Sequence, residues 1–501
     1  MEVLSGTVLW VIVFLLVAYF LLVTWIGRKG VRFSKSMNGF ATARGSVHPW
    51  IVGASFAATY ASANLFIGIP GLAYQYGTSV LWYTLGCFGV SWIGLLLFAK
   101  TFWRYGKQFG RVSTLPEWLG KRYNSKTLQV LVSLLVLFNV YYIVGQNVGL
   151  ATIFGTVIGI PYVWGIIIAV VITILYIGLG GAYAQLITDG LQGIMMAVTS
   201  VFILLSLLWT IGGGFHVFGT LNDKLASIDP GLTAPIASVG PYNSALAIAA
   251  VQFLLFGFVL MPHLLNKILS LETEEQLRPF TISSGVFLCL VSTLTVIGGL
   301  AARVVFPALE NADQAIPAYL FEAFPPVVAA FFIVGIISAV LSSTDSLYLG
   351  IISSIGNDLY RTIAASISKR AWNDPVYDDR SVKVAKGSLF VVGFLTLYFS
   401  LQRPESLSLL IQFSFSAIIS GIFAPITLGY LWNRSNSIGA IASVITGTSL
   451  YVGFTSSAII DNIYLAMFAS SAAGFAVMVG AGLLFAQDER QKQIFLLKKS
   501  V

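Results

Sequence analysis

The chain has 501 residues, of which 57% are hydrophobic and 10% are charged, and its formal net charge is +8. Soluble proteins are about a quarter charged, so this composition excludes a globular domain with a single anchor. It indicates a protein that crosses the lipid bilayer many times. The positive charges form no basic patch with interleaved aromatic residues, so we expect no nucleic-acid partner.

The first apolar run, from about residue 8 to 26, lacks a basic leader and a cleavage site, so we expect a retained helix rather than a signal peptide. A hydrocarbon core about 30 Å thick needs roughly 20 apolar residues per helix. We predict thirteen spans, of which the fourth and ninth are long enough to tilt or break, over residues 6–27, 49–71, 80–99, 127–156, 161–179, 189–212, 244–262, 282–306, 326–354, 387–402, 407–431, 438–456 and 464–486.

Lysine and arginine orient these spans, because cytoplasmic loops carry an excess of them. If Met1 lies outside, 25 of the 28 basic residues fall in segments that face the cytoplasm. The other 3 are Lys224, Arg303 and Arg403. We therefore predict a multi-pass plasma-membrane protein with its N-terminus outside and its C-terminus in the cytoplasm.

The second span contains "GASFAATYASANLFIGIPGLAYQYG", residues 53–77. Gly68, Pro70 and Gly71 lie within four positions, and a helix of that content can unwind locally. Transporters use the carbonyls of unwound helices to coordinate ions. Close packing through small residues is an alternative that is compatible with this interpretation.

The stretch "GLGGAYAQLITDGLQG", residues 178–193, predicts a turn at the paired glycines. Thr188 is then suited to cap the following helix, and Asp189 would lie in its first turn, where a carboxylate complements the helix dipole. The other hypothesis is that Asp189 is a cation ligand.

The ninth span carries "SAVLSSTDSLY", residues 338–348. Ser338, Ser342, Asp345 and Ser346 share one helical face. A carboxylate costs at least about 2.5 kcal/mol at mid-bilayer, so it must be protonated, paired, or next to a cation or water. Hydroxyl and carboxylate oxygens suit a hard cation. This face therefore predicts a Na⁺ or H⁺ site, with an interhelical hydrogen-bond network as the alternative.

Other function classes find little support in the residues. The two cysteines lie in apolar runs and the three histidines lack metal-ligand spacing, so we expect no metal centre. No nucleophile–base pair indicates an enzyme. The short tail after the last span disfavours a sensor or transceptor, and a passive channel stays open as an alternative.

Together the motifs resemble the sodium/solute symporter family over roughly residues 5–455. They are "FIGIPGLAYQYG", "GGAYAQLITDGLQG", "MPHLLNKILS" and "SAVLSSTDSLY", each on the appropriate span. The resemblance implies an all-α, leucine-transporter-like fold with two inverted five-helix repeats, in which the second and seventh spans are broken. The implied divisions are a first helix and loop (1–48), the first repeat (49–212), an extracellular loop (213–243), the second repeat (244–431) and two peripheral helices with a tail (432–501).

The resemblance also implies ion sites. The main Na⁺ site would take carbonyls of Ala58, Ala61 and Ala339 and hydroxyls of Ser342 and Ser343. A second site, found in some members, would fall on Asp189, Ser342, Asp345 and Ser346. Asp345 stands where a hydroxyl is usual, which leaves tighter Na⁺ binding or H⁺ coupling there as alternatives.

The second and seventh spans look closest to the pantothenate, organic-anion and proline branches of the family. Tyr60 and the pair Leu254 and Phe258 depart from the proline pattern, so we expect a small carboxylate such as pantothenate or a monocarboxylate. Proline-like amino acids and sugars are the alternatives, and no obligate protein partner is evident. The residues expected to line the substrate pocket are Tyr60, Ser62, Asn64, Gln75, Tyr83, Asn139, Gln146, Gln252 and Phe258.

Overall fold

A computed structural model describes residues 6–110, 112–368, 374–402 and 407–485. Within these ranges all regular secondary structure is helical, and there is no β-strand. The first half holds α1 (Gly6–Gly30), α2 (Met37–Thr42), α3 (Pro49–Ala63), α4 (Ile69–Tyr76), α5 (Leu81–Leu85), α6 (Ser91–Gln108), α7 (Leu115–Arg122), α8 (Lys126–Val136), α9 (Asn139–Ile153), α10 (Tyr162–Thr210) and α11 (Val217–Ile228). The second half holds α12 (Ala245–Phe258), α13 (Pro262–Leu269), α14 (Leu277–Val305), α15 (Ala315–Ala323), α16 (Pro326–Ser354), α17 (Arg361–Ser368), α18 (Pro375–Leu401), α19 (Leu407–Leu431), α20 (Ser437–Ser456) and α21 (Ile463–Leu484).

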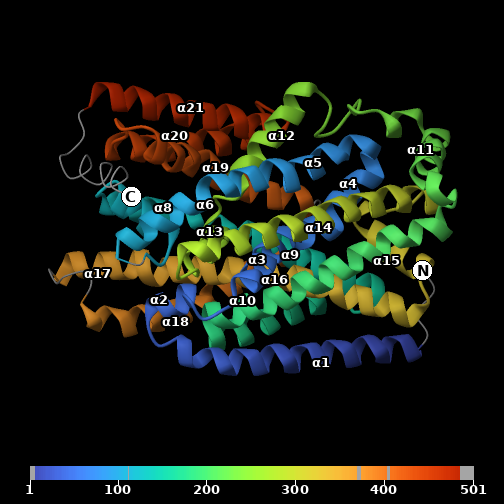
Figure 1. Ribbon diagram of the computed structural model, residues 1–501, viewed down its shortest axis with the longest axis horizontal. Coiled ribbons are helices and arrows are strands. Elements are labelled where there is room, and N and C mark those ends of the chain that lie inside the picture. Colours follow the sequence, from blue (N-terminus) through green and yellow to red (C-terminus); the bar gives the residue numbers. More distant parts are fainter. Residues whose placement is uncertain (1–5, 111, 369–373, 403–406, 486–501) are drawn as a thin grey trace.

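Four helices form the centre of the bundle. Helix α3 packs against α10, α14 and α16, and α10 also packs against α16. Every residue of α16 from Phe332 to Ser354 is buried, including its serines and its aspartate. Helix α1 lies along the outer side of the bundle against α10 (Figure 1). The polar motif of α16 is therefore surrounded by protein rather than by lipid.

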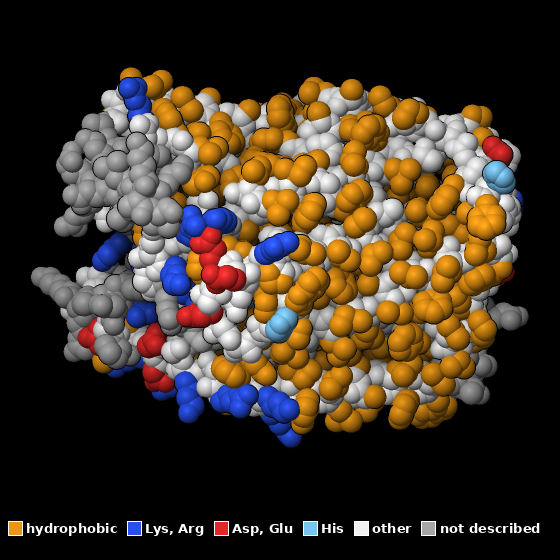
Figure 2. Space-filling model, viewed as in Figure 1, with side chains coloured by type: hydrophobic (Ala, Val, Ile, Leu, Met, Phe, Trp, Pro, Cys, Tyr) orange, Lys and Arg blue, Asp and Glu red, His pale blue; other side chains and the backbone are white. Residues whose placement is uncertain are grey.

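The long helices run side by side along the longest axis of the molecule (Figure 1). Helix α1 begins at one end of the bundle and α21 finishes at the other (Figure 1). On the face shown in Figure 2, lysine and arginine side chains gather at the end where α2 and α17 lie, while hydrophobic side chains cover most of the rest. This surface suits a bilayer around the middle of the bundle.

Eleven stretches of the described residues are long and apolar enough to cross a membrane. One of them, Pro49–Gln108, has 60 residues and is interrupted at Gly77, whose φ is +68°. The shorter apolar helix Tyr162–Leu175 lies in α10, ahead of a break at Gly181, where φ is +53°. If each interruption separates two spans, the total is thirteen, which stays a prediction.

Several expected helix boundaries need revision. The fourth span is interrupted, because α8 ends at Val136 and α9 begins at Asn139, whereas the ninth is the single helix α16. The seventh span does not end at 262, since α13 continues it to Leu269. Lys267, which the sequence places among the cytoplasmic residues, lies in this continuation and is paired through the tertiary contacts described below.

Candidate functional site

Helix α3 is broken at Ser62, not at the glycines and proline that the sequence favoured. Ser62 has φ +49° and ψ 178°, a strained conformation for a residue with a Cβ. A π-helical turn, Asn64–Gly68, follows the break and leads into α4. Pro70 lies near the start of α4, directly after the π-helical turn. The expectation of local unwinding in this span is correct, but its position is shifted toward the centre of the helix.

Two side-chain acceptors stabilise this break, one from α9 and one from Ser62 itself. The Ala63 N–H donates to Gln146 Oε1 of α9 at 2.9 Å, and the Asn64 N–H donates to Ser62 Oγ at 3.1 Å. Without Gln146 the freed Ala63 N–H would be buried and unsatisfied, which costs about 1–3 kcal/mol. Gln146, expected in the substrate pocket, thus also has a structural role that sequence patterns did not indicate.

Across the same region, serine hydroxyls of α16 meet backbone carbonyls of α3. Ser342 Oγ donates to the carbonyl of Ala58 at 3.1 Å and to that of Ala339 at 2.7 Å. Ser343 Oγ donates to the carbonyl of Thr59 at 2.8 Å. We call this group of oxygens, from Ala58, Thr59, Ala339, Ser342 and Ser343, the α3–α16 seam.

The seam contains four of the five residues predicted for the main Na⁺ site. The fifth, Ala61, is one turn further along α3, and its carbonyl accepts the Asn64 N–H. The carbonyl of Thr59 takes part instead, a contact that the sequence did not predict. A serine hydroxyl can rotate and present lone pairs, so these neutral oxygens fit a small hard cation. Ion binding at these residues stays a prediction.

A second polar group lies beside the seam, around Asp189 of α10. Its Oδ2 accepts hydrogen bonds from Ser55 at 3.4 Å, Thr59 at 3.1 Å and Ser346 at 3.2 Å. Ser346 also receives a hydrogen bond from Gln185. Asp189 is fully buried and lies inside α10, eight residues after the break, so it is not in a first helical turn as a dipole-compensating carboxylate would be. Thr188 bonds back to the carbonyls of Ala184 and Gln185 rather than capping.

Lys267 completes this second group, and sequence reasoning placed it in a cytoplasmic segment. Its Nζ lies 2.5 Å from Asp189 Oδ2 and 2.6 Å from Ser55 Oγ. The side chain of Lys267 is 2% exposed and that of Asp189 is 0% exposed, so this is a buried ion pair. We call Ser55, Thr59, Asp189, Lys267 and Ser346 the Asp189–Lys267 cluster. The available signal was a lysine in an apolar helix that follows a proline, but its partner is 78 positions away.

The second predicted site is only partly brought together. Ser346 contacts Asp189, and its hydroxyl also donates to the Ser342 carbonyl at 2.9 Å. Ser342 itself directs its hydroxyl toward the seam instead. Asp345 is buried on the same helix. Ser338, which shares the face, bonds to Gly335 of its own helix.

Several predicted pocket residues gather around the break in α3. The Tyr60 ring packs edge-on against Phe258 with centroids 4.6 Å apart, and its hydroxyl pairs with Ser91 at 2.7 Å. Asn64 Nδ2 donates to Tyr83 OH at 3.1 Å. Phe258 is the last residue of α12, where the second broken helix begins its non-helical segment before α13. The two broken helices therefore meet at Tyr60 and Phe258.

Buried polar atoms near the break have no protein partner among the described residues. They include Asn64 Oδ1, Gln146 Nε2, both side-chain polar atoms of Asn139, and both ring nitrogens of His263. Unpaired buried polar atoms are rare and need an explanation, such as a bound ligand or water. The sequence did not single out His263. Its ring centroid lies 5.8 Å from that of Tyr142 and 6.3 Å from that of Phe258.

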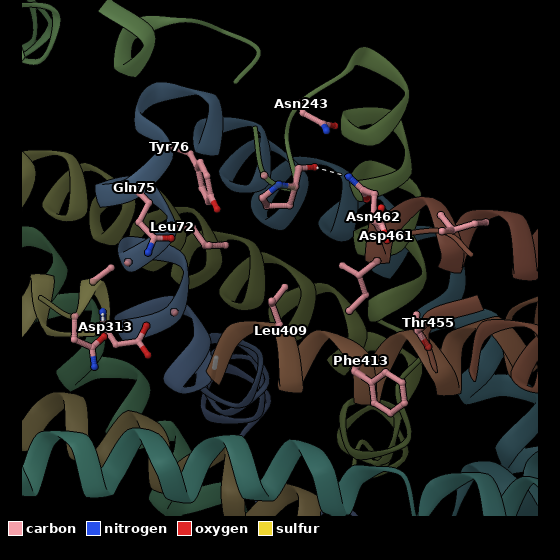
Figure 3. Close-up of a pocket in the computed structure, with 18 of the residues that line it drawn as sticks. Leu72, Gln75, Tyr76, Asn243, Asp313, Leu409, Phe413, Thr455, Asp461 and Asn462 are labelled. Carbon is pink, nitrogen blue, oxygen red and sulfur yellow. Dashed lines mark hydrogen bonds between the residues drawn. The ribbon is translucent and has the colours of Figure 1, made fainter. Parts of the chain in front are cut away.

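The two remaining glutamines lie apart from this group. Gln75 lines an outer cavity of about 770 Å³, whose other lining residues include members of α4, α19, α20 and α21. Gln252 donates to the carbonyl of Trp82 at 2.8 Å, between α12 and α5. In Figure 3, Gln75, Asp313, Asn243, Leu409 and Phe413 border the outer cavity from different parts of the chain. The cavity adjoins α4, the helix that continues from the break.

Comparison with known proteins now decides the family. The sequence profile of the Sodium:solute symporter family matches residues 40–447. The chain belongs to this family. Its members are transporters and not enzymes, and membership supports Na⁺-coupled symport and a location in a membrane.

Individual relatives agree with this assignment. The sodium/pantothenate symporter of Haemophilus influenzae is 27% identical over 426 residues, covering 84% of this chain and 83% of the relative. The osmoregulated proline transporter OpuE of Bacillus subtilis is 24% identical, covering 86% of each chain. The solved structure of a Na⁺-coupled sialic acid symporter superposes with a TM-score of 0.79 at 18% identity, covering 97% of this chain and 99% of the other. The predicted all-helical, leucine-transporter-like fold is confirmed.

Proposed function

We propose that this symporter imports a small organic carboxylate, of the pantothenate or monocarboxylate type, together with Na⁺. The observation that carries the proposal is the α3–α16 seam. There Ser342 and Ser343 direct their hydroxyls at the carbonyls of Ala58 and Thr59, beside the break in α3. Na⁺ is transported cargo at this position, held by oxygens of two helices that belong to different halves of the chain.

Na⁺ at the seam would join α3 to α16 and favour the state open to the outside. Solute binding beside the break at Ser62 would then favour closure over the pair. In the cytoplasm, where Na⁺ is scarce, the ion would leave and the seam would loosen. Each Na⁺ that crosses 100 mV supplies about 2.3 kcal/mol. A monocarboxylate carries the opposite charge, so one Na⁺ drives its accumulation through the Na⁺ concentration gradient.

The carboxylate class is supported by two independent points. Two relatives that are 27% identical, from Haemophilus influenzae and Escherichia coli, are sodium/pantothenate symporters. The residues around the break supply side-chain amides, from Asn64 and Gln146, and the N-terminal end of the half-helix that continues from Ala63. Helix N-termini and amide donors suit a carboxylate. Tyr60 and Phe258 would contact its apolar part.

We further propose that residues 49–212 and 244–431 are the two inverted repeats. The first span of each range is the broken one, α3–α4 in the first and α12–α13 in the second. The charge distribution supports an N-terminus outside and a C-terminus in the cytoplasm, with the outer cavity then facing the exterior. The outer cavity has carboxylates from Glu310, Asp313 and Asp461 among its lining residues.

Solute counterflow in proteoliposomes tests the substrate class. Purified protein is reconstituted, loaded in turn with pantothenate, short monocarboxylates, proline and sugars, and assayed with and without a Na⁺ gradient. The proposal expects Na⁺-dependent exchange of a carboxylate and not of sugars. Exchange driven equally well by H⁺ in the absence of Na⁺ would favour the alternative of H⁺ coupling through Asp345. Exchange restricted to proline would move the protein to the amino-acid branch.

A further inference from the structure

The Asp189–Lys267 cluster combines the features of a cation site with a cation that belongs to the protein. Oxygens of Ser55, Thr59 and Ser346 surround the Asp189 carboxylate within 3.4 Å of Oδ2. The ammonium of Lys267 lies among them, 2.5 Å from Asp189 and 2.6 Å from Ser55. All five side chains are buried.

We propose that Lys267 is a tethered cation that occupies the position of a second transported Na⁺, so that this symporter couples one Na⁺ to each solute. The inference rests on the proposed function, because it concerns the number of ions in the same transport cycle. It gives Lys267 the role of setting the number of Na⁺ ions per solute. Lys267 was not among the residues predicted for the second site.

The charges and ligands explain why the ammonium and a second Na⁺ would exclude each other. A carboxylate in a dry interior needs a compensating positive charge. Lys267 supplies it directly, and its ammonium uses the same oxygens, Asp189 Oδ2 and Ser55 Oγ, that a metal ion would need. Two positive charges within a few ångströms repel strongly at low dielectric. A mobile ion therefore cannot join the cluster while Lys267 stays in it.

The neighbouring seam lacks such a built-in charge. Ser342, Ser343 and the carbonyls of Ala58, Thr59 and Ala339 bring no formal charge of their own. Thr59 belongs to both groups, through its carbonyl at the seam and its hydroxyl at Asp189. The seam is thus the place for the transported ion, and the cluster beside it is already neutralised at Asp189.

Lys267 also connects the two broken helices. It lies on α13, whereas Ser55 and Thr59 lie on α3 and Asp189 lies on α10. A tethered ammonium can perform the structural task of a second ion, which is to hold these helices together, without being released into the cytoplasm. The driving force is correspondingly that of a single ion.

The test counts Na⁺ in two ways on the full-length protein. Equilibrium binding of ²²Na⁺ to protein in detergent gives the ions per chain. The ratio of ²²Na⁺ to labelled solute taken up by proteoliposomes, with the solute identified by counterflow, gives the ions per solute. The wild type is expected to give one by both measurements. Lys267→Met removes the tethered charge, leaves Asp189 as an anionic ligand, and is expected to bind two.

Three control variants separate the charge of Lys267 from its packing. Lys267→Arg keeps a cation and is expected to give one ion, as is the neutral pair Lys267→Met with Asp189→Asn. Asp345→Asn asks whether a second ion is bound by Asp345 instead. A folded Lys267→Met protein should also gain thermal stability with added Na⁺ in excess of the wild type, because a ligand that binds only the folded state stabilises it.

Two ions per solute in the wild type would overturn the inference, and their reduction to one in Asp345→Asn would assign the second ion to Asp345. One ion in a folded Lys267→Met protein would overturn it as well. If Lys267→Met does not fold, Lys267→Gln, which removes the charge and keeps a polar side chain, replaces it in the count and is expected to bind two ions. Uptake that needs no Na⁺ in the wild type would instead contradict the proposed function, so the two failures are distinguishable.

Discussion

The α3–α16 seam and the Asp189–Lys267 cluster are neighbours that share helices α3 and α16 and differ in their chemistry. At the seam, neutral hydroxyls of Ser342 and Ser343 meet neutral carbonyls of α3. In the cluster, a buried carboxylate meets a buried ammonium. The comparison shows that two adjacent groups of oxygen atoms in one protein can differ in whether they release the cation they bind. Neutral oxygens can bind and release a mobile ion, whereas a carboxylate paired with a lysine keeps its cation.

Removing one partner of the charged pair is the strongest way to break this comparison. Lys267→Met leaves Asp189 buried without its cation, which costs about 3–5 kcal/mol. We expect a large fall in melting temperature in Na⁺-free detergent, measured by differential scanning fluorimetry. Adding Asp189→Asn removes both charges and should recover most of that loss. A double variant as unstable as the single one would show that Lys267 acts through packing.

Removing the support of the α3 break should have the next largest effect. Gln146→Leu leaves the Ala63 N–H buried without an acceptor, at a cost of about 1–3 kcal/mol. We expect the KM for solute to rise about tenfold, measured as initial uptake at saturating Na⁺. Asn147→Leu is the matched control, because its amide donates to Ser400, away from the break, at 3.2 Å. Equal KM values for the two variants would contradict this role of Gln146.

The seam itself is tested by removing one hydroxyl. Ser343→Ala deletes an oxygen that the proposal assigns to Na⁺, a loss of about 1.4 kcal/mol. We expect the Na⁺ concentration for half-maximal uptake to rise about tenfold, with a smaller change in solute KM. Ser342→Ala should behave similarly. Ser338→Ala on the same helix is the control, since its hydroxyl bonds to Gly335 of its own helix. Unchanged Na⁺ activation in both seam variants is the result that contradicts the assignment.

Asp313 lies in the outer cavity, in the short 3₁₀ helix Ala312–Gln314, and shows how burial acts on a carboxylate that has, among the described residues, no lysine partner of the kind Asp189 has. Burial raises its pKa to about 6. The folded state therefore binds a proton more readily than the unfolded state, so stability should rise as pH falls from 7 toward 4. Asp313→Asn should flatten that part of the profile, with the smallest effect of the series. Melting temperatures of both proteins between pH 4.5 and 7 measure it. If melting temperature depended more steeply on pH in Asp313→Asn than in the wild type, Asp313 would be excluded as the source of this pH dependence.

Sequence alone was sufficient for the features that depend on local composition. Apolar runs of membrane length indicated the helices, since any backbone polar group in lipid must be satisfied within its own segment. The serines of α16 stood out because hydroxyls and a carboxylate are costly in such a run. The motifs and their order indicated the family and the likeness of fold, which the family profile and the solved structure confirm.

The tertiary structure decided which residues meet. Ser62, rather than Gly68 or Pro70, breaks α3, because Gln146 from α9 supplies an acceptor at that level of the bundle. Lys267 counts as a cytoplasmic charge by position, yet it is buried against Asp189, 78 residues earlier. Hydropathy is a property of neighbouring residues in the chain, whereas a buried charge is tolerated only through a partner that helix packing brings to it. That partner becomes evident once α3, α10 and α13 are placed side by side.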